Sequence, residues 1–114
     1  MPMKRLTLIL LAVAALLAVL VTAQSKQTFT GTITDDECPK GDHSAMQMGS
    51  NDTECTLACI QDHGALYLLY DGKSAYNLSD QKAPKAFAGK KATITGTLDA
   101  KTNTIKVESI TAAK

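Results

Sequence analysis

Two short stretches of strict two-residue alternation most restrict what this chain can fold into. Residues 27–34 and residues 91–98 each place apolar or small side chains on one side and threonines on the other. This period predicts β-strands with one buried face and one threonine-rich face toward water. The central glycines, Gly31 and Gly96, are typical of the bent strands of a small closed barrel. The expected inward positions are Phe29, Gly31, Ile33, Ala92, Ile94, Gly96 and Leu98.

Three further strands and a short helix complete the expected scaffold. Residues 65–70 are apolar on both faces, which predicts a buried strand, and Asp71-Gly72 predicts a hairpin to a partner strand at 73–78. A short helical segment is expected at 79–87. The last strand is expected at 104–110.

The inward side chains of the last strand change phase before Ile110, which indicates a bulge near Glu108–Ser109. The expected order is therefore strand, insert, hairpin, short helix, strand, strand. Five strands with a short helix between the third and fourth predict a mainly β, OB-like Greek-key barrel. The alternative is an open five-stranded sheet that packs on the helix.

The insert between strands 1 and 2, residues 35–64, holds the residues that can do chemistry. All three cysteines, both histidines and two of the four methionines lie in it. We expect a helix in its second half, capped by Asp52 or Thr53 and running to about Asp62, with Gly64 as its terminator. The insert is therefore predicted to be a cysteine-containing helical segment.

Residues 1–23 are predicted to be a signal peptide, because a basic start precedes an apolar run and a small-x-small site ends at Ala23. An uncleaved anchor is the alternative. Residues 24–114 would then form a periplasmic or secreted domain that meets the membrane only through this segment before cleavage.

Composition excludes several classes of function. Without Lys4 and Arg5 the chain has no arginine and a net charge of −1 rather than +1. Nucleic-acid binding relies on clustered cations and on arginine, so we do not expect it. There is no nucleophile elbow or phosphate loop, and the acidic run 35–37 is interpreted as a solvated turn, so the domain is predicted to be non-enzymatic.

A metal site is the first hypothesis for the insert. Cys55 and Cys59 share one face of the expected helix, and Cys38 and His43 from the preceding loop would complete a Cys3His set for copper or zinc. His63 continues the helical stripe, although the helix dipole alone also favours a histidine there.

A disulfide is the competing hypothesis, because exported cysteines tend to pair. Cys38 would bond to Cys59, or to Cys55, and leave one free thiol. A reactive redox thiol is a third hypothesis. His43 with Met46 and Met48 also has the ligand types that suit Cu(I) or Ag(I), unless the methionines only fill gaps against the barrel.

The motifs that suggest a family are Phe29-x-Gly31-x-Ile33, the Cys38…His43…Cys55-x3-Cys59 set, Gly64-Ala-x-Tyr67-x-Leu69, Tyr76-x-Leu78 and 87–96. With them the chain resembles small exported bacterial domains of unknown function with OB-like strands, which implies the fold and export but no activity. More loosely, His43-x-x-Met46-x-Met48 is similar to the ligands of periplasmic copper and silver chaperones, which are also OB-type barrels. Those proteins cover the ion with a tryptophan, and this chain has none.

Two functions follow from these observations. The first is a metal-binding module that handles copper or zinc outside the cytoplasm. The second is a disulfide-stapled module, without metal, that binds a protein or envelope partner.

Overall fold

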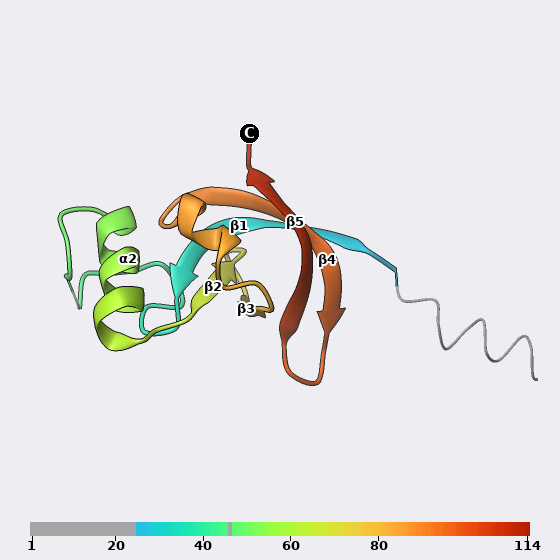
Figure 1. The fold of residues 1–114 in the computed structure, drawn as a ribbon, viewed down its shortest axis with the longest axis horizontal. Coiled ribbons are helices and arrows are strands. Elements are labelled where there is room, and N and C mark those ends of the chain that lie inside the picture. Colours follow the sequence, from blue (N-terminus) through green and yellow to red (C-terminus); the bar gives the residue numbers. More distant parts are fainter. Residues whose placement is uncertain (1–24, 46) are drawn as a thin grey trace, which may run out of the picture.

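The computed structural model describes residues 25–45 and 47–114. The predicted signal peptide, residues 1–23, lies outside the described residues, as does Met46. No helix in the described part of the chain is long and apolar enough to cross a membrane. The elements, in chain order, are β1 (Gln27–Asp35), α2 (Asp52–His63), β2 (Tyr67–Tyr70), β3 (Ala75–Leu78), the 3-10 helix η1 (Ala83–Phe87), β4 (Lys91–Asp99) and β5 (Thr104–Ala112) (Figure 1).

The five strands form one sheet that closes into a barrel in the order β1-β2-β3-β5-β4. Strand β1 is long enough to pair antiparallel with β2 through its second half and with β4 through its first half. Strands β3 and β5 pair in parallel, and the other neighbours are antiparallel. The prediction of a mainly β fold with five strands is thus confirmed.

The barrel interior holds a small apolar core. The two-residue pattern is confirmed in β4, and Ile33 and Ile94 are fully buried. At the end of β1 it is wrong for Thr34, which is buried instead of facing water because its hydroxyl donates to the Cys38 carbonyl at 2.8 Å. The buried cluster consists of Ile33, Tyr67, Leu69, Leu78, Ala88, Ala92, Ile94 and Ile105.

Both strand glycines permit a close approach between neighbouring strands of the sheet. A Cβ at Gly31 would collide with the carbonyl of Tyr70, and one at Gly96 would collide with the carbonyl of Lys106. The bulge is also confirmed: β4 pairs with Ser109 and then directly with Val107, so Glu108 is the extra residue.

Helix α2 begins one residue earlier than its sequence suggests. Asn51 is the N-cap, and its side chain accepts a hydrogen bond from the Glu54 amide at 2.9 Å. Asn51 can take this role because its backbone is extended, whereas Asp52 is already the first helical residue. Gly64 ends the helix with φ 66°, as expected from its freedom to adopt the left-handed region.

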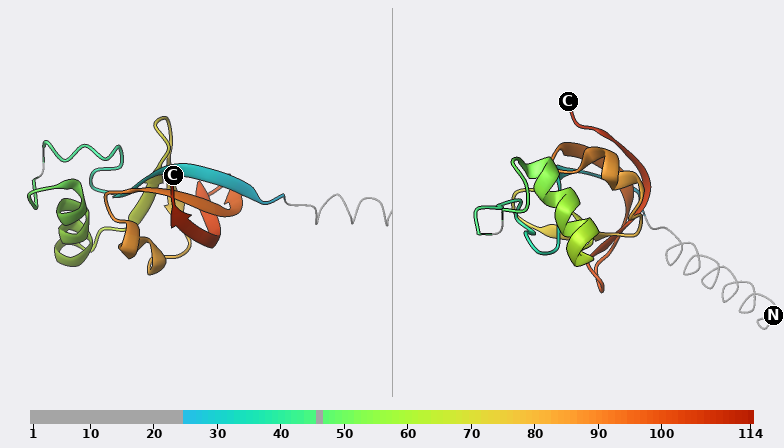
Figure 2. Two further views of the ribbon diagram at one scale, coloured as in Figure 1. Left: turned by 90° about the horizontal axis from the view of Figure 1, so that it is seen from above. Right: turned by 60° about the vertical axis from the view of Figure 1, so that its left-hand side comes forward.

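The helix lies across the end of the barrel at which β1 finishes (Figures 1 and 2). Its N-terminus is fixed there by Thr53, whose hydroxyl donates to the Ala88 carbonyl at 2.7 Å. Gly89 allows this contact, because a Cβ at that position would come within 2.5 Å of the Thr53 amide nitrogen. The apolar residues of the helix that face the barrel then rest on the core.

The second helical segment is shorter than predicted. Asp80 forms a turn instead, because its carboxylate accepts from the amides of Lys82 and Ala83 at 2.8 and 3.1 Å. The 3-10 helix η1 starts only after this turn, with Pro84 in its first turn.

Candidate metal centre

Two segments that are distant in sequence meet beside the barrel end. One is the turn that follows β1, which carries Glu37, and the other is the last turn and a half of α2, which carries Cys59 and His63. Cys59 and His63 are four residues apart, so they lie on the same face of the helix. That face is turned toward the turn after β1, where Glu37 lies.

Glu37, Cys59 and His63 form a group that can hold a metal ion. One ligand atom from each lies within 4.8 Å of the other two. His63 Nδ1 is 2.8 Å from Glu37 Oε2. Cys59 is fully buried, whereas the side chains of His63 and Glu37 are 37% and 28% exposed, so the group is open to solvent on one side.

The protonation of the three groups is coupled. Burial, and then the hydrogen bond to Glu37, raises the pKa of the Cys59 thiol to about 12. The hydrogen bond between Glu37 and His63 lowers the pKa of the carboxyl and raises the pKa of the imidazole. Near neutral pH, the group therefore consists of a carboxylate, an intact thiol and an imidazole that retains its proton more readily than usual.

Asp35 holds the turn that presents Glu37. Its carboxylate is fully buried and accepts from the amides of Glu37 and Cys38, both at 3.0 Å. The interpretation of residues 35–37 as a solvated turn is therefore wrong for Asp35. Thr34 and Asp35 are both buried at the end of β1, so the two-residue alternation does not account for the burial of Asp35.

His43 is buried between two carboxylates and does not join this group. Its Nε2 lies 3.4 Å from Asp35 Oδ2, and its Nδ1 lies 3.3 Å from Asp52 Oδ1. Both ring nitrogens thus face acidic partners, and the imidazole ties the loop to the N-terminal turn of α2. This contact explains the burial of a histidine in a loop.

The three cysteines are free, buried thiols. The predicted disulfide between Cys38 and Cys59 is not present, because Cys59 faces Glu37 and His63 instead. The Cys55 thiol points to the Gly49 carbonyl, at 3.3 Å. Burial raises the pKa of Cys38, with a contribution from the charge of Asp35, and Cys55 is close enough to add to this effect.

The ligand set differs from the set that the sequence suggests. Among the described residues, no group of three or more converging histidine, cysteine and acidic side chains contains Cys38, His43 or Cys55. Cys59 and His63 are predicted from the sequence as metal ligands. In the structure they converge with Glu37, which the sequence does not predict as a ligand. No local signal in the sequence distinguishes Glu37 from Asp35 and Asp36 beside it. Met46 lies outside the described residues, and Met48 is half-buried.

No family model, curated protein or solved structure matches this chain.

Proposed function

We propose that this protein is a metal-binding domain that holds Zn²⁺ through Glu37, Cys59 and His63. The observation that carries the proposal is the convergence of these three ligand types within 4.8 Å. Thiolate sulfur, imidazole nitrogen and carboxylate oxygen are the ligands that zinc prefers in proteins.

The dimensions of the group support this ion. A tetrahedral zinc ion with bonds of about 2.0–2.3 Å requires its ligand atoms to lie about 3.3–3.7 Å apart. The 2.8 Å contact between His63 Nδ1 and Glu37 Oε2 would open slightly, and the Cys59 sulfur already lies within 4.8 Å of both partners. Copper is the weaker candidate, since Cu(I) favours thiolate and thioether over carboxylate.

Three protein ligands leave a fourth coordination position, and two of the three side chains are partly exposed. Structural zinc sites are closed by four protein ligands, whereas sites with three protein ligands keep an open position for water or substrate. We infer that the domain carries or buffers zinc through this open site rather than catalysing a reaction, because the sequence has no nucleophile elbow or phosphate loop. A strand order that places β1 between β2 and β4, with β3 parallel to β5, supports an OB-type barrel as its scaffold. The predicted signal peptide supports a role outside the cytoplasm.

Calorimetric titration of the reduced, metal-free protein with Zn²⁺ tests this proposal. We expect one site per chain. The variants Cys59→Ser and His63→Gln should each weaken binding by at least about tenfold, since loss of even an outer-shell partner has an effect of that size.

Cys55→Ser is the matched control, because Cys55 is a buried thiol on the same helix outside the ligand group. This variant should bind zinc as the wild type does. Co²⁺ provides a second readout, because a thiolate-to-cobalt charge-transfer band should appear in the wild type and in Cys55→Ser but not in Cys59→Ser. Equal zinc affinity for both serine variants would contradict the proposal.

A further inference from the structure

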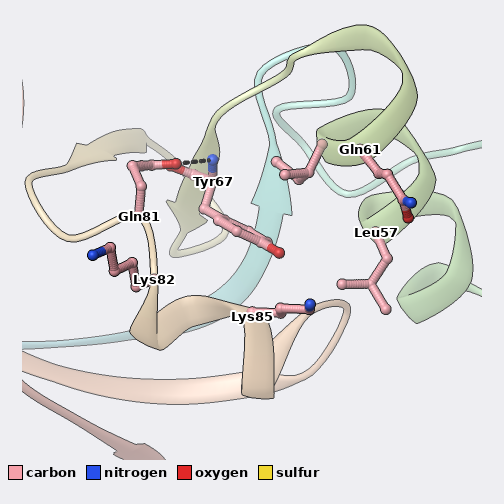
Figure 3. Close-up of a pocket in the computed structure, with 7 residues that line it drawn as sticks. Leu57, Gln61, Tyr67, Gln81, Lys82 and Lys85 are labelled. Carbon is pink, nitrogen blue, oxygen red and sulfur yellow. Dashed lines mark hydrogen bonds between the residues drawn. The ribbon is translucent and has the colours of Figure 1, made fainter.

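A second candidate site lies on the other side of α2, away from the cysteines. A cleft of about 560 Å³ opens between the helix, the start of β2 and η1 (Figure 3). This volume lies within the range of about 300–1,000 Å³ that small-molecule sites occupy. From this cleft we propose a binding site for a small amphipathic monocarboxylate, a molecule with an apolar chain and one carboxylate.

One wall of the cleft is apolar. Leu57 and Ile60 of α2 pack at the edge of the core cluster, and the ring of Tyr67 belongs to that cluster. Tyr67 is held in place by Gln81, whose side chain accepts from the Tyr67 amide at 2.8 Å and donates to its carbonyl at 3.0 Å (Figure 3). An alkyl chain placed here would cover apolar surface without moving the backbone.

The polar groups of the cleft select for negative charge. Lys82 and Lys85 line it, none of its lining residues is acidic, and neither lysine forms an ion pair within the described part of the chain. Figure 3 shows the Lys85 amine and the Tyr67 hydroxyl pointing into the same space beside Leu57. Burial raises the pKa of Tyr67, so its hydroxyl keeps the proton that it would donate.

These donors match a carboxylate better than a phosphate. In Figure 3 the Lys82 amine points away from the Tyr67 hydroxyl, so the Lys85 ammonium and the Tyr67 phenol are the two groups that can each donate to one carboxylate oxygen. Charge-assisted hydrogen bonds of this kind are the stronger ones. A dianionic phosphate is usually bound by arginine forks or by the N-terminus of an α-helix; no arginine lines the cleft, and the helix beside it, η1, is a five-residue 3-10 helix. The donors therefore favour a ligand with one negative charge, and the apolar wall favours an apolar chain on the same ligand.

An NMR titration of the zinc-free protein with sodium octanoate tests the site. For a probe of about ten non-hydrogen atoms we expect a Kd of about 0.1–1 mM. Amide shifts should concentrate at Leu57, Tyr67, Gln81 and Lys85. Octanol, which is neutral, should bind at least about fivefold more weakly, and octylammonium should not bind.

Lys85→Gln should weaken octanoate binding about fivefold and leave octanol binding unchanged. The control is Lys73→Gln, which removes an exposed lysine outside the cleft. Cys59→Ser should bind octanoate normally, so the outcome is independent of the zinc proposal. The inference would be overturned if octanoate and octanol bound with equal affinity, or if the amide shifts were confined to regions outside the cleft. Binding of the protein only to anionic lipid vesicles, and not to octanoate, would also overturn it.

Discussion

The protons of the candidate metal centre give the sharpest prediction. The pKa of Cys59 is raised from 9.0 to about 12, so at pH 8 the thiol is protonated and zinc must displace that proton to bind. A pKa raised to about 12 corresponds to a penalty of about a thousandfold in affinity relative to an unperturbed thiol.

The sign of the pH dependence follows directly. Above the pKa of His63 binding releases about one proton, from Cys59, so each pH unit upward should tighten the apparent Kd about tenfold. Below the raised pKa of His63 the imidazole must also lose a proton, and the dependence should approach about a hundredfold per pH unit. Glu37 contributes no proton, because its lowered pKa keeps it ionised in this range.

Calorimetry in two buffers of different ionisation enthalpy counts these protons. We expect about one proton at pH values above the His63 pKa and about two below it, and at least one at pH 8 because Cys59 is protonated there. His63→Gln should remove only the additional acidic proton, and Cys59→Ser should remove the proton seen at pH 8. A count near zero at pH 8, or the same count in the wild type and in Cys59→Ser, would refute the assignment of the thiol as a ligand.

Three changes to the scaffold have predictable costs in urea unfolding. Gly89→Ala should cost about 2–4 kcal/mol, because it combines a positive φ with a collision at the Thr53 amide. Its control, Gly41→Ala, has the same sign of φ but open space around the new methyl group and should cost only about 1 kcal/mol. Equal losses for the two variants would show that the contact with the helix is unimportant. Ile94→Ala should cost about 2–5 kcal/mol because the side chain is fully buried, and a loss below about 1 kcal/mol would contradict a close-packed core. Asp35→Asn should cost about 1–3 kcal/mol and also weaken zinc binding, because it loosens the turn that presents a ligand; unchanged zinc affinity would speak against that role.

Local patterns predicted much of the scaffold. The alternation around Gly31 and Gly96 placed two strands, Asp71-Gly72 placed the hairpin, and the change of phase near Glu108 placed the bulge. Each of these signals is contained in a few neighbouring residues, so no knowledge of the rest of the chain is needed to interpret it. The boundaries moved by one to a few residues where side chains such as Asn51 capped the backbone differently.

The composition of the metal centre was only partly predictable. The i, i+4 spacing of Cys59 and His63 put both on one helix face, and the sequence named both. Their partner is 26 residues away from His63, and nothing local distinguishes Glu37 from the acidic residues beside it. His43 shows the converse: its sequence context suggested a ligand, yet two carboxylates surround it.

The sequence by itself determined the strands, the helix and the segment that holds the cysteines and histidines, because hydrophobic period and turn chemistry act over short distances. Only the tertiary structure decided that Asp35 is buried, that the three thiols are unpaired, and that Glu37 meets the helix. Such convergence depends on how β1 ends and on where α2 docks against the barrel. These features are set by contacts between residues far apart in the chain, such as Thr53 with Ala88.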